Sequence, residues 1–239
     1  MRADELARKT DLALLSPLLT GRELVRRVEL AVNHPFASIC VAPCHVRLLA
    51  HMLRGRSTAA ATVAGFPLGY TTTAAKVAEA GEALTAGAAE IDAVMNLALF
   101  KSGRRDLVEA EIKALRRVTA GAVLKVIIET SYLDDAEKEE AADLVIYGGA
   151  DFVKTSTGFA GGGATERDVR LLSYRAAGRI GVKASAGIDT AEKALAMLRA
   201  GATRIGTSRG VEIVEELRDA AGPIEKAPIT RGGTRVPVP

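Results

Sequence analysis

Residues 181–207 read GVKASAGIDTAEKALAMLRAGATRIGT. A short apolar run at 181–185 is followed by a helical pattern that begins after Thr190 and ends at Gly201, and a second apolar run follows at 203–207. Thr is a preferred residue just before a helix, and Gly is the preferred residue just after one. This stretch therefore predicts a strand, a helix and a second strand, which is the repeating unit of parallel α/β folds.

The same alternation continues along most of the chain. The predicted strands cover residues 11–15, 38–42, 58–64, 90–96, 123–129, 151–156, 181–185 and 203–207. The predicted helices cover residues 21–33, 43–54, 72–87, 103–118, 134–148, 166–177, 190–200 and 210–219. Eight strand–helix pairs indicate a single (β/α)8 barrel, the TIM barrel. A doubly wound sheet is the alternative, but no dinucleotide-binding glycine pattern follows the first strand.

The composition predicts one soluble domain. The chain has 239 residues, 48% of them apolar, and a net charge of only +3. We expect the barrel to span 1–222 and the Pro- and Gly-rich segment 223–239 to form a flexible C-terminal tail. The chain has no basic stripe interleaved with aromatic residues, which argues against nucleic-acid binding. It also has no apolar run long enough for a membrane span and no signal peptide, so we expect a cytoplasmic protein.

Three lysines occupy predicted barrel strands, where lysine is unusual. Lys125 lies in the fifth strand, Lys154 in the sixth and Lys183 in the seventh. A buried ammonium group is costly unless it is paired, and crowding lowers the affinity of the amine for its proton. Because a neutral lysine amine attacks carbonyl carbons, the pattern predicts Schiff-base chemistry.

Other polar residues lie near the carboxyl ends of the strands, where barrel enzymes carry their active sites. Asp92 and Asn96 share one face of the fourth strand, and Lys125 shares one face of the fifth with Glu129. The residues allow two interpretations. Either these groups are catalytic, or they form a buried ion-pair network, with pairs Lys125–Glu129 and Lys183–Asp92, that only holds the barrel together.

The segment DFVKTSTGF at 151–159 resembles the Schiff-base segment of the deoxyribose-phosphate aldolase family, whose members are class I aldolases. Further segments resemble the family in the same order along the chain, and the resemblance covers residues 10–215. They are TVAGFPLG at 62–69, EIDAVMN at 90–96, LKVIIET at 124–130, GGAT at 162–165, GVKAS at 181–185 and RIGTS at 204–208.

The resemblance implies roles that the residue pattern alone leaves open. It implies that Lys154 forms the imine with the aldehyde, that Lys183 lowers the pKa of that lysine, and that Asp92 relays protons through water. Lys125 is expected to support the site. The other residues expected to support it are Asn96, Glu129, Asp11, and Cys40 as a packed and inert thiol.

The resemblance also implies a phosphate-binding site after the last strands. Its expected residues are Thr157, Gly158, Gly187, Ser208 and Arg209. The sequence departs from the family pattern at four positions, which are Ala13 in place of a hydroxyl residue, Ala186 in place of a glycine, Asp189 in place of a basic residue and Arg209 in place of a second serine. A carboxylate at 189 would repel a phosphate. We therefore expect Arg209 to replace the lost positive charge, either by holding the phosphate or by pairing with Asp189.

The activity implied is the reversible cleavage of 2-deoxy-D-ribose 5-phosphate to acetaldehyde and D-glyceraldehyde 3-phosphate, in deoxynucleoside catabolism. No cofactor and no metal are expected, and His34, His45 and His51 are not expected to be ligands. The expected partner is a small phosphosugar or aldehyde, and the family implies a homodimer. Two alternatives stay open: a related Schiff-base lyase with a different acceptor aldehyde, and a phosphosugar-binding barrel or isomerase without aldol activity.

Overall fold

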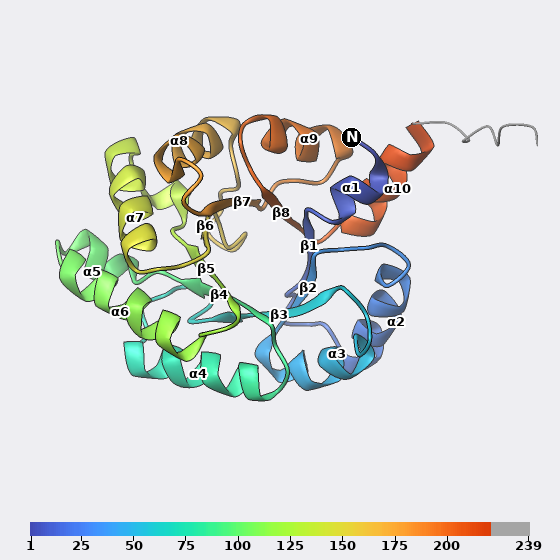
Figure 1. Ribbon diagram of the computed structural model, residues 1–239, viewed down its shortest axis with the longest axis horizontal. Coiled ribbons are helices and arrows are strands. Elements are labelled where there is room, and N and C mark those ends of the chain that lie inside the picture. The colour runs from blue at the N-terminus through green and yellow to red at the C-terminus, as the bar shows by residue number, and fades with distance from the viewer. Residues whose placement is uncertain (221–239) are drawn as a thin grey trace, which may run out of the picture.

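Eight parallel strands close into a barrel in the computed structural model, which describes residues 1–220 (Figure 1). The strands pair in chain order, and β8 pairs back with β1. They are β1 (Thr10–Leu14), β2 (Ser38–Val41), β3 (Ala59–Ala64), β4 (Glu90–Val94), β5 (Val123–Ile127), β6 (Phe152–Lys154), β7 (Gly181–Ser185) and β8 (Arg204–Thr207). The predicted (β/α)8 barrel is confirmed, and the doubly wound sheet is wrong. The predicted tail 223–239 lies outside the described residues.

A ring of helices surrounds the barrel, and α1 lies beside α10 where the chain returns to its start (Figure 1). The helices are α1 (Ala3–Ala7), α2 (Gly21–Ala31), α3 (Val46–Met52), α4 (Thr73–Thr85), α5 (Leu97–Lys101), α6 (Arg105–Val118), α7 (Asp135–Tyr147), α8 (Glu166–Ala176), α9 (Ala191–Arg199) and α10 (Gly210–Ala220), with 3₁₀ turns η1 (Pro43–His45) and η2 (Thr130–Tyr132). The sequence did not predict α1 and α5. Five residues are too few for a helical period to stand out.

The helix starts read from the sequence are confirmed by their caps. The Thr165 side chain accepts a hydrogen bond from the Asp168 backbone N–H, and Thr190 accepts one from Lys193. Each bond satisfies a backbone donor that the first helical turn leaves free. These caps fix where α8 and α9 begin, and so they fix the lengths of the loops after β6 and β7.

The two faces of the strands have opposite chemistry. Ile91, Leu124 and Val182 pack into one apolar cluster with the buried faces of the helices. Their neighbours in sequence point the other way, into the barrel, because side chains alternate along a strand. The inward residues of β4, β5 and β7 include Asp92, Lys125 and Lys183, all fully or almost fully buried. The apolar layer between barrel and helices therefore stabilises the fold, while the barrel interior holds charged groups.

Candidate active site

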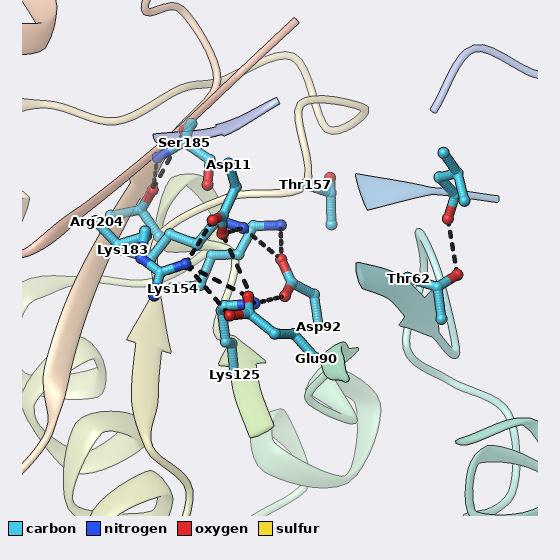
Figure 2. A network of polar contacts seen from close by, with 12 residues as sticks. Asp11, Thr62, Glu90, Asp92, Lys125, Lys154, Thr157, Lys183, Ser185 and Arg204 are labelled. Carbon is cyan, nitrogen blue, oxygen red and sulfur yellow. Dashed lines mark hydrogen bonds and ion pairs between the residues drawn. The ribbon is translucent and has the colours of Figure 1, made fainter. Parts of the chain in front are cut away.

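Asp92 lies at the centre of a network of charged side chains inside the barrel (Figure 2). Its Oδ1 accepts a hydrogen bond from Lys125 Nζ at 2.8 Å. Its Oδ2 accepts one from Lys154 Nζ and one from Lys183 Nζ, each at 2.7 Å. The strand register explains this convergence, because Asp92 is paired with Lys125 and Lys154 with Lys183 on neighbouring strands. The three lysines singled out in the sequence meet at one carboxylate.

Asp11, Glu90 and Arg204 extend this network around the barrel (Figure 2). Asp11 Oδ2 lies 2.6 Å from Lys183 Nζ, and Asp11 Oδ1 accepts a hydrogen bond from Arg204 at 2.6 Å. Glu90 Oε2 lies 2.5 Å from Lys125 Nζ and 3.4 Å from Arg204 Nη1. The complete network holds four cationic side chains, Lys125, Lys154, Lys183 and Arg204, and three carboxylates, Asp11, Glu90 and Asp92.

Sequence reasoning missed Glu90 and Arg204, although a signal for both was present. Glu90 precedes Asp92 by two residues on β4, and Arg204 precedes Gly206 by two residues on β8. Residues two apart share a face of a strand. The same alternation rule that selected the lysines therefore also places these two side chains in the barrel.

The surroundings shift the pKa values of the lysines in opposite directions. Burial lowers the pKa of Lys154, the charge of Lys183 lowers it further, and the attraction of Asp92 does not offset both. Burial also acts to lower the pKa values of Lys183 and Lys125, but Asp11 and Asp92 raise both to above the usual range, with help from Glu90 at Lys125. Lys154 is therefore the lysine of the network that gives up its proton most readily.

The carboxylates at the centre of the network stay ionised. Burial would raise the pKa of Asp92, but Lys125, Lys154 and Lys183 together hold it well below its usual range. Burial would also raise the pKa of Asp11, but the charges of Lys183, Lys125 and Arg204 together lower it. Both groups therefore serve as charged acceptors of hydrogen bonds from the neighbouring cationic side chains.

A cavity of about 390 Å³ opens at the carboxyl ends of the strands, and Lys154 and Lys183 line it. The expected phosphate-site residues Thr157, Gly158, Gly187, Ser208 and Arg209 line it as well. The cavity therefore joins the reactive lysines to the loops after β6, β7 and β8, and it brings together most of the residues predicted from the sequence.

Gly206 on β8 leaves room for the lysine that stands beside it. A Cβ at this position would lie 2.9 Å from Lys183 Cε and 2.9 Å from Ser185 Oγ, closer than side-chain carbons normally approach. The strand can pass so near to Lys183 only because residue 206 has no side chain.

Cys40 lies on β2 and lines the cavity. Its side chain packs with Ala61 and Val63 and is 1% exposed. Burial and the nearby charge of Asp92 raise the pKa of the Cys40 thiol to about 12. The thiol stays protonated at neutral pH, in agreement with the expected packed and inert role.

The predicted pair of Lys125 with Glu129 is wrong. Strand β5 ends at Ile127, and Glu129 has a left-handed backbone with φ of 53°, so the alternation does not extend to it. Its carboxylate instead accepts hydrogen bonds from the backbone N–H of Thr157 at 3.1 Å and from the Thr157 hydroxyl at 2.5 Å. Glu129 thus holds the loop after β6 and engages both donors of Thr157, whereas the predicted Lys183–Asp92 pair is confirmed.

Asn96, which was expected to support the site, does not line the cavity. Strand β4 ends at Val94, two residues earlier than the alternation requires. The Asn96 side chain accepts a hydrogen bond from Leu99 N at 3.1 Å and donates one to Thr71 O at 3.4 Å. It therefore caps α5 and ties that helix to the loop before α4.

The turn after β7 carries two of the substitutions that distinguish this sequence from the family pattern, Ala186 and Asp189. Ala186 and Gly187 both have left-handed backbone, with φ of 71° and 75°. This conformation suits glycine and strains alanine by about 1 kcal/mol or more. Asp189 forms its ion pair with Lys193 of α9, at 2.7 Å, and not with Arg209 as one alternative expected.

A second arginine reaches the same end of the cavity. Arg27 of α2 lines it, and its guanidinium donates to the backbone carbonyl of Ser208 at 3.4 Å. Arg27 and Arg209 therefore lie at the end of the cavity that also contains the N-terminus of α10. Arg27 could not be predicted from the sequence, because nothing in an exposed helical pattern indicates which of its arginines faces a distant loop.

Within residues 1–220, no cluster of three or more His, Cys, Asp and Glu side chains could hold a metal ion. His34 is buried beside Glu215 of α10, and the His45 ring lies 3.3 Å from the Leu19 carbonyl oxygen. No helix in this part of the chain is long and apolar enough to cross a membrane.

Comparison with known proteins identifies the relatives of this barrel. A family model described as "DeoC/LacD family aldolase" matches residues 10–215. The chain belongs to this family. It is 46% identical over 211 residues to the deoxyribose-phosphate aldolase of Bacillus subtilis strain 168, covering 88% of this chain and 95% of that protein. It is 47% identical over 214 residues to that of Caldanaerobacter subterraneus subsp. tengcongensis, covering 88% and 93%.

Solved structures agree with this membership in the DeoC/LacD family. The aldolase QR15 is 44% identical with a TM-score of 0.88, and the match covers 91% of this chain and 97% of that one. A deoxyribose-phosphate aldolase from Aeropyrum pernix, described as tetrameric, is 32% identical with a TM-score of 0.85, covering 91% and 93%. The resemblance inferred from the sequence motifs is confirmed.

Proposed function

We propose that this chain is a deoxyribose-phosphate aldolase, which cleaves 2-deoxy-D-ribose 5-phosphate reversibly to acetaldehyde and D-glyceraldehyde 3-phosphate through a Schiff base on Lys154. One observation carries the choice of this lysine. Lys154 lines the cavity, its pKa is lowered, and Asp92 and Lys183 lie beside it. Lys125 does not line the cavity, and the pKa values of Lys125 and Lys183 are raised.

Imine formation is the first step of the proposed reaction. The neutral amine of Lys154 attacks the aldehyde carbon of the open-chain sugar and forms a C–N bond, while the carbonyl oxygen takes up a proton. The resulting hydroxyl leaves as water after a second protonation, and the nitrogen becomes an iminium. Asp92, whose Oδ2 lies 2.7 Å from Lys154 Nζ, relays these protons through water.

Cleavage follows because the iminium accepts an electron pair. A base removes the proton of the C3 hydroxyl, the C2–C3 bond breaks, and its electrons move toward the iminium. The products are glyceraldehyde 3-phosphate and an enamine of acetaldehyde. Protonation of the enamine carbon and addition of water release acetaldehyde and restore the amine. Lys183 keeps its charge throughout, since its pKa is raised, and it stabilises the oxygen that carries developing negative charge.

Reductive trapping tests this proposal. The protein is incubated with acetaldehyde or with deoxyribose 5-phosphate and then reduced with borohydride. It is digested, and the masses of its peptides are measured by mass spectrometry. We expect a reduced adduct on Lys154 from both compounds, and none when borohydride is omitted. An adduct from acetaldehyde alone would favour a lyase with another acceptor. Absence of any adduct would exclude Schiff-base catalysis and favour a barrel without aldol activity.

Asp189 favours the lyase with another acceptor as a second candidate. Its carboxylate lines the cavity at the end where a phosphate would bind. Lys193 pairs with it and offsets its charge, and Arg27 and Arg209 add two positive charges at the same end. The balance of these groups supports a phosphorylated substrate, so we keep deoxyribose 5-phosphate as the proposed substrate.

Replacing Arg27 or Arg209 by Gln is expected to raise KM for deoxyribose 5-phosphate by about tenfold, because each change removes one charge-assisted contact with a phosphate. The kcat/KM for unphosphorylated deoxyribose should stay unchanged. Steady-state kinetics with both sugars measures the difference. Arg26→Gln is the matched control, since Arg26 lies next to Arg27 on α2 but does not line the cavity. An unchanged KM in both variants would refute the assigned phosphate end.

The assembly and the location of the protein remain predictions. A homodimer and a cytoplasmic location are expected from the family resemblance and the composition. Size-exclusion chromatography with light scattering measures the first directly.

A further inference from the structure

The interior of the barrel carries an odd number of charges. The titratable or charged side chains around Lys154 of β6 are Asp11 of β1, Cys40 of β2, Glu90 and Asp92 of β4, Lys125 of β5, Lys183 of β7 and Arg204 of β8. Three more, Arg27, Asp189 and Arg209, line the cavity farther out. Strand β3 contributes no charge to this interior, because its inward side chains are Ala61 and Val63, which pack with Cys40. With the Cys40 thiol protonated, four cations face three carboxylates.

Such a network has one positive charge too many. Every member is at least mostly buried, so water does little to stabilise the excess charge. The network becomes neutral when one cationic group releases a proton. One of the four side chains is therefore expected to be uncharged in the resting protein.

The contacts select Lys154 as that side chain. Lys125 lies within 3.7 Å of three carboxylates, and Lys183 lies 2.6 Å and 2.7 Å from two. Lys154 contacts only Asp92, through an oxygen that Lys183 also uses. Arg204 contacts Asp11 and Glu90, and a guanidinium does not lose its proton in proteins. Lys154 is thus the amine whose positive charge would be offset least by nearby carboxylates.

We propose that Arg204 is a positioning residue whose permanent charge keeps Lys154 in its neutral, nucleophilic form. Arg204 does not line the cavity and acts through the carboxylates. Arg204 pairs with Asp11 and Glu90. These two carboxylates therefore cannot also offset a positive charge on Lys154. The inference rests on the proposed function only in calling this amine the nucleophile. Its charge state is a property of the free protein.

Three variants change the balance between cations and carboxylates in the network, each in a known direction. R204M leaves three cations and three carboxylates, so Lys154 should hold its proton and its pKa should rise. E90Q leaves four cations and two carboxylates, so the same pKa should fall. The double variant R204M/E90Q has three cations and two carboxylates, again one excess cation, and should return close to the original value. Each single variant is expected to move the pKa of Lys154 by about one pH unit or more, a tenfold change in neutral amine at fixed pH.

Competitive acetylation with acetic anhydride measures this pKa without any substrate. The protein is labelled briefly across a pH series, and the Lys154 peptide is quantified by mass spectrometry. The acid limb of the pH profile of kcat/KM for deoxyribose 5-phosphate should shift in parallel. R175M is the control, because Arg175 pairs with Asp143 on the outside of the barrel and should leave the labelling midpoint unchanged. Circular dichroism checks that each variant is folded.

The outcomes separate this inference from the proposed function. An unchanged Lys154 midpoint in R204M and E90Q, or a double variant that keeps the shift of R204M, would overturn the inference even if the aldolase assay succeeds. Shifts in the expected directions support it even if no borohydride adduct forms. If R204M does not fold, the opposite shift expected for E90Q still decides the question.

Discussion

Replacing Lys154 by Met is expected to lower kcat/KM for deoxyribose 5-phosphate by about 10⁴-fold or more, because the covalent route that supplies most of the acceleration is lost. Met has a side chain of similar length and fills the same space. The borohydride adduct with acetaldehyde should disappear from the whole protein. Steady-state kinetics and intact-protein mass measure the two effects.

The same variant should not lose stability. Lys154 is the neutral amine of the network, so its replacement leaves three charged cations, Lys125, Lys183 and Arg204, matched with three carboxylates. We therefore expect a free energy of unfolding in urea equal to or above that of the original protein. Lys113→Met on the outer face of α6 is the control and should keep full activity. An adduct that persists on Lys183 in the Lys154 variant would mean that the nucleophile is assigned wrongly.

Replacing Asp92 by Asn should damage both catalysis and stability. The carboxylate that takes up protons is lost, which is expected to lower kcat by about 10²–10⁴-fold. Three lysines also lose their shared acceptor, and uncompensated buried charges cost about 3–5 kcal/mol of unfolding free energy. Kinetics and urea denaturation at neutral pH measure the two losses.

The stability defect of Asp92→Asn should depend on pH in one direction. The pKa of Asp92 in the folded protein lies well below its ordinary value of 3.8. A carboxylate of this kind stabilises the fold above its unfolded pKa, and the contribution is lost as the pH falls below 3.8 toward the folded value. The difference in unfolding free energy between the two proteins should therefore be constant near neutral pH and shrink in acid.

Asp143→Asn provides the comparison for this prediction. Asp143 also accepts two hydrogen bonds from an arginine, but it lies between α7 and α8 near the surface. Exposed ion pairs contribute about 1 kcal/mol or less. A defect as large at Asp143 as at Asp92 would contradict the importance given to the barrel network.

The sequence by itself determined the architecture and the lysines. Strand and helix periods, and the caps at Thr165 and Thr190, predicted the barrel because each depends on residues close together in the chain. Alternation within a strand placed Lys125, Lys154 and Lys183 on the inner face, since it needs only the parity of each position. The aldolase motifs then gave the family.

The tertiary structure decided what depends on groups far apart in the chain. It ended β5 before Glu129, because that carboxylate binds Thr157 of another loop. It placed Arg27 at the cavity, although the sequence pattern of its helix does not indicate which residue Arg27 contacts. Above all, it distinguished the three lysines. The charge of a buried amine is set by its distances to carboxylates on other strands, and only closure of the barrel fixes those distances.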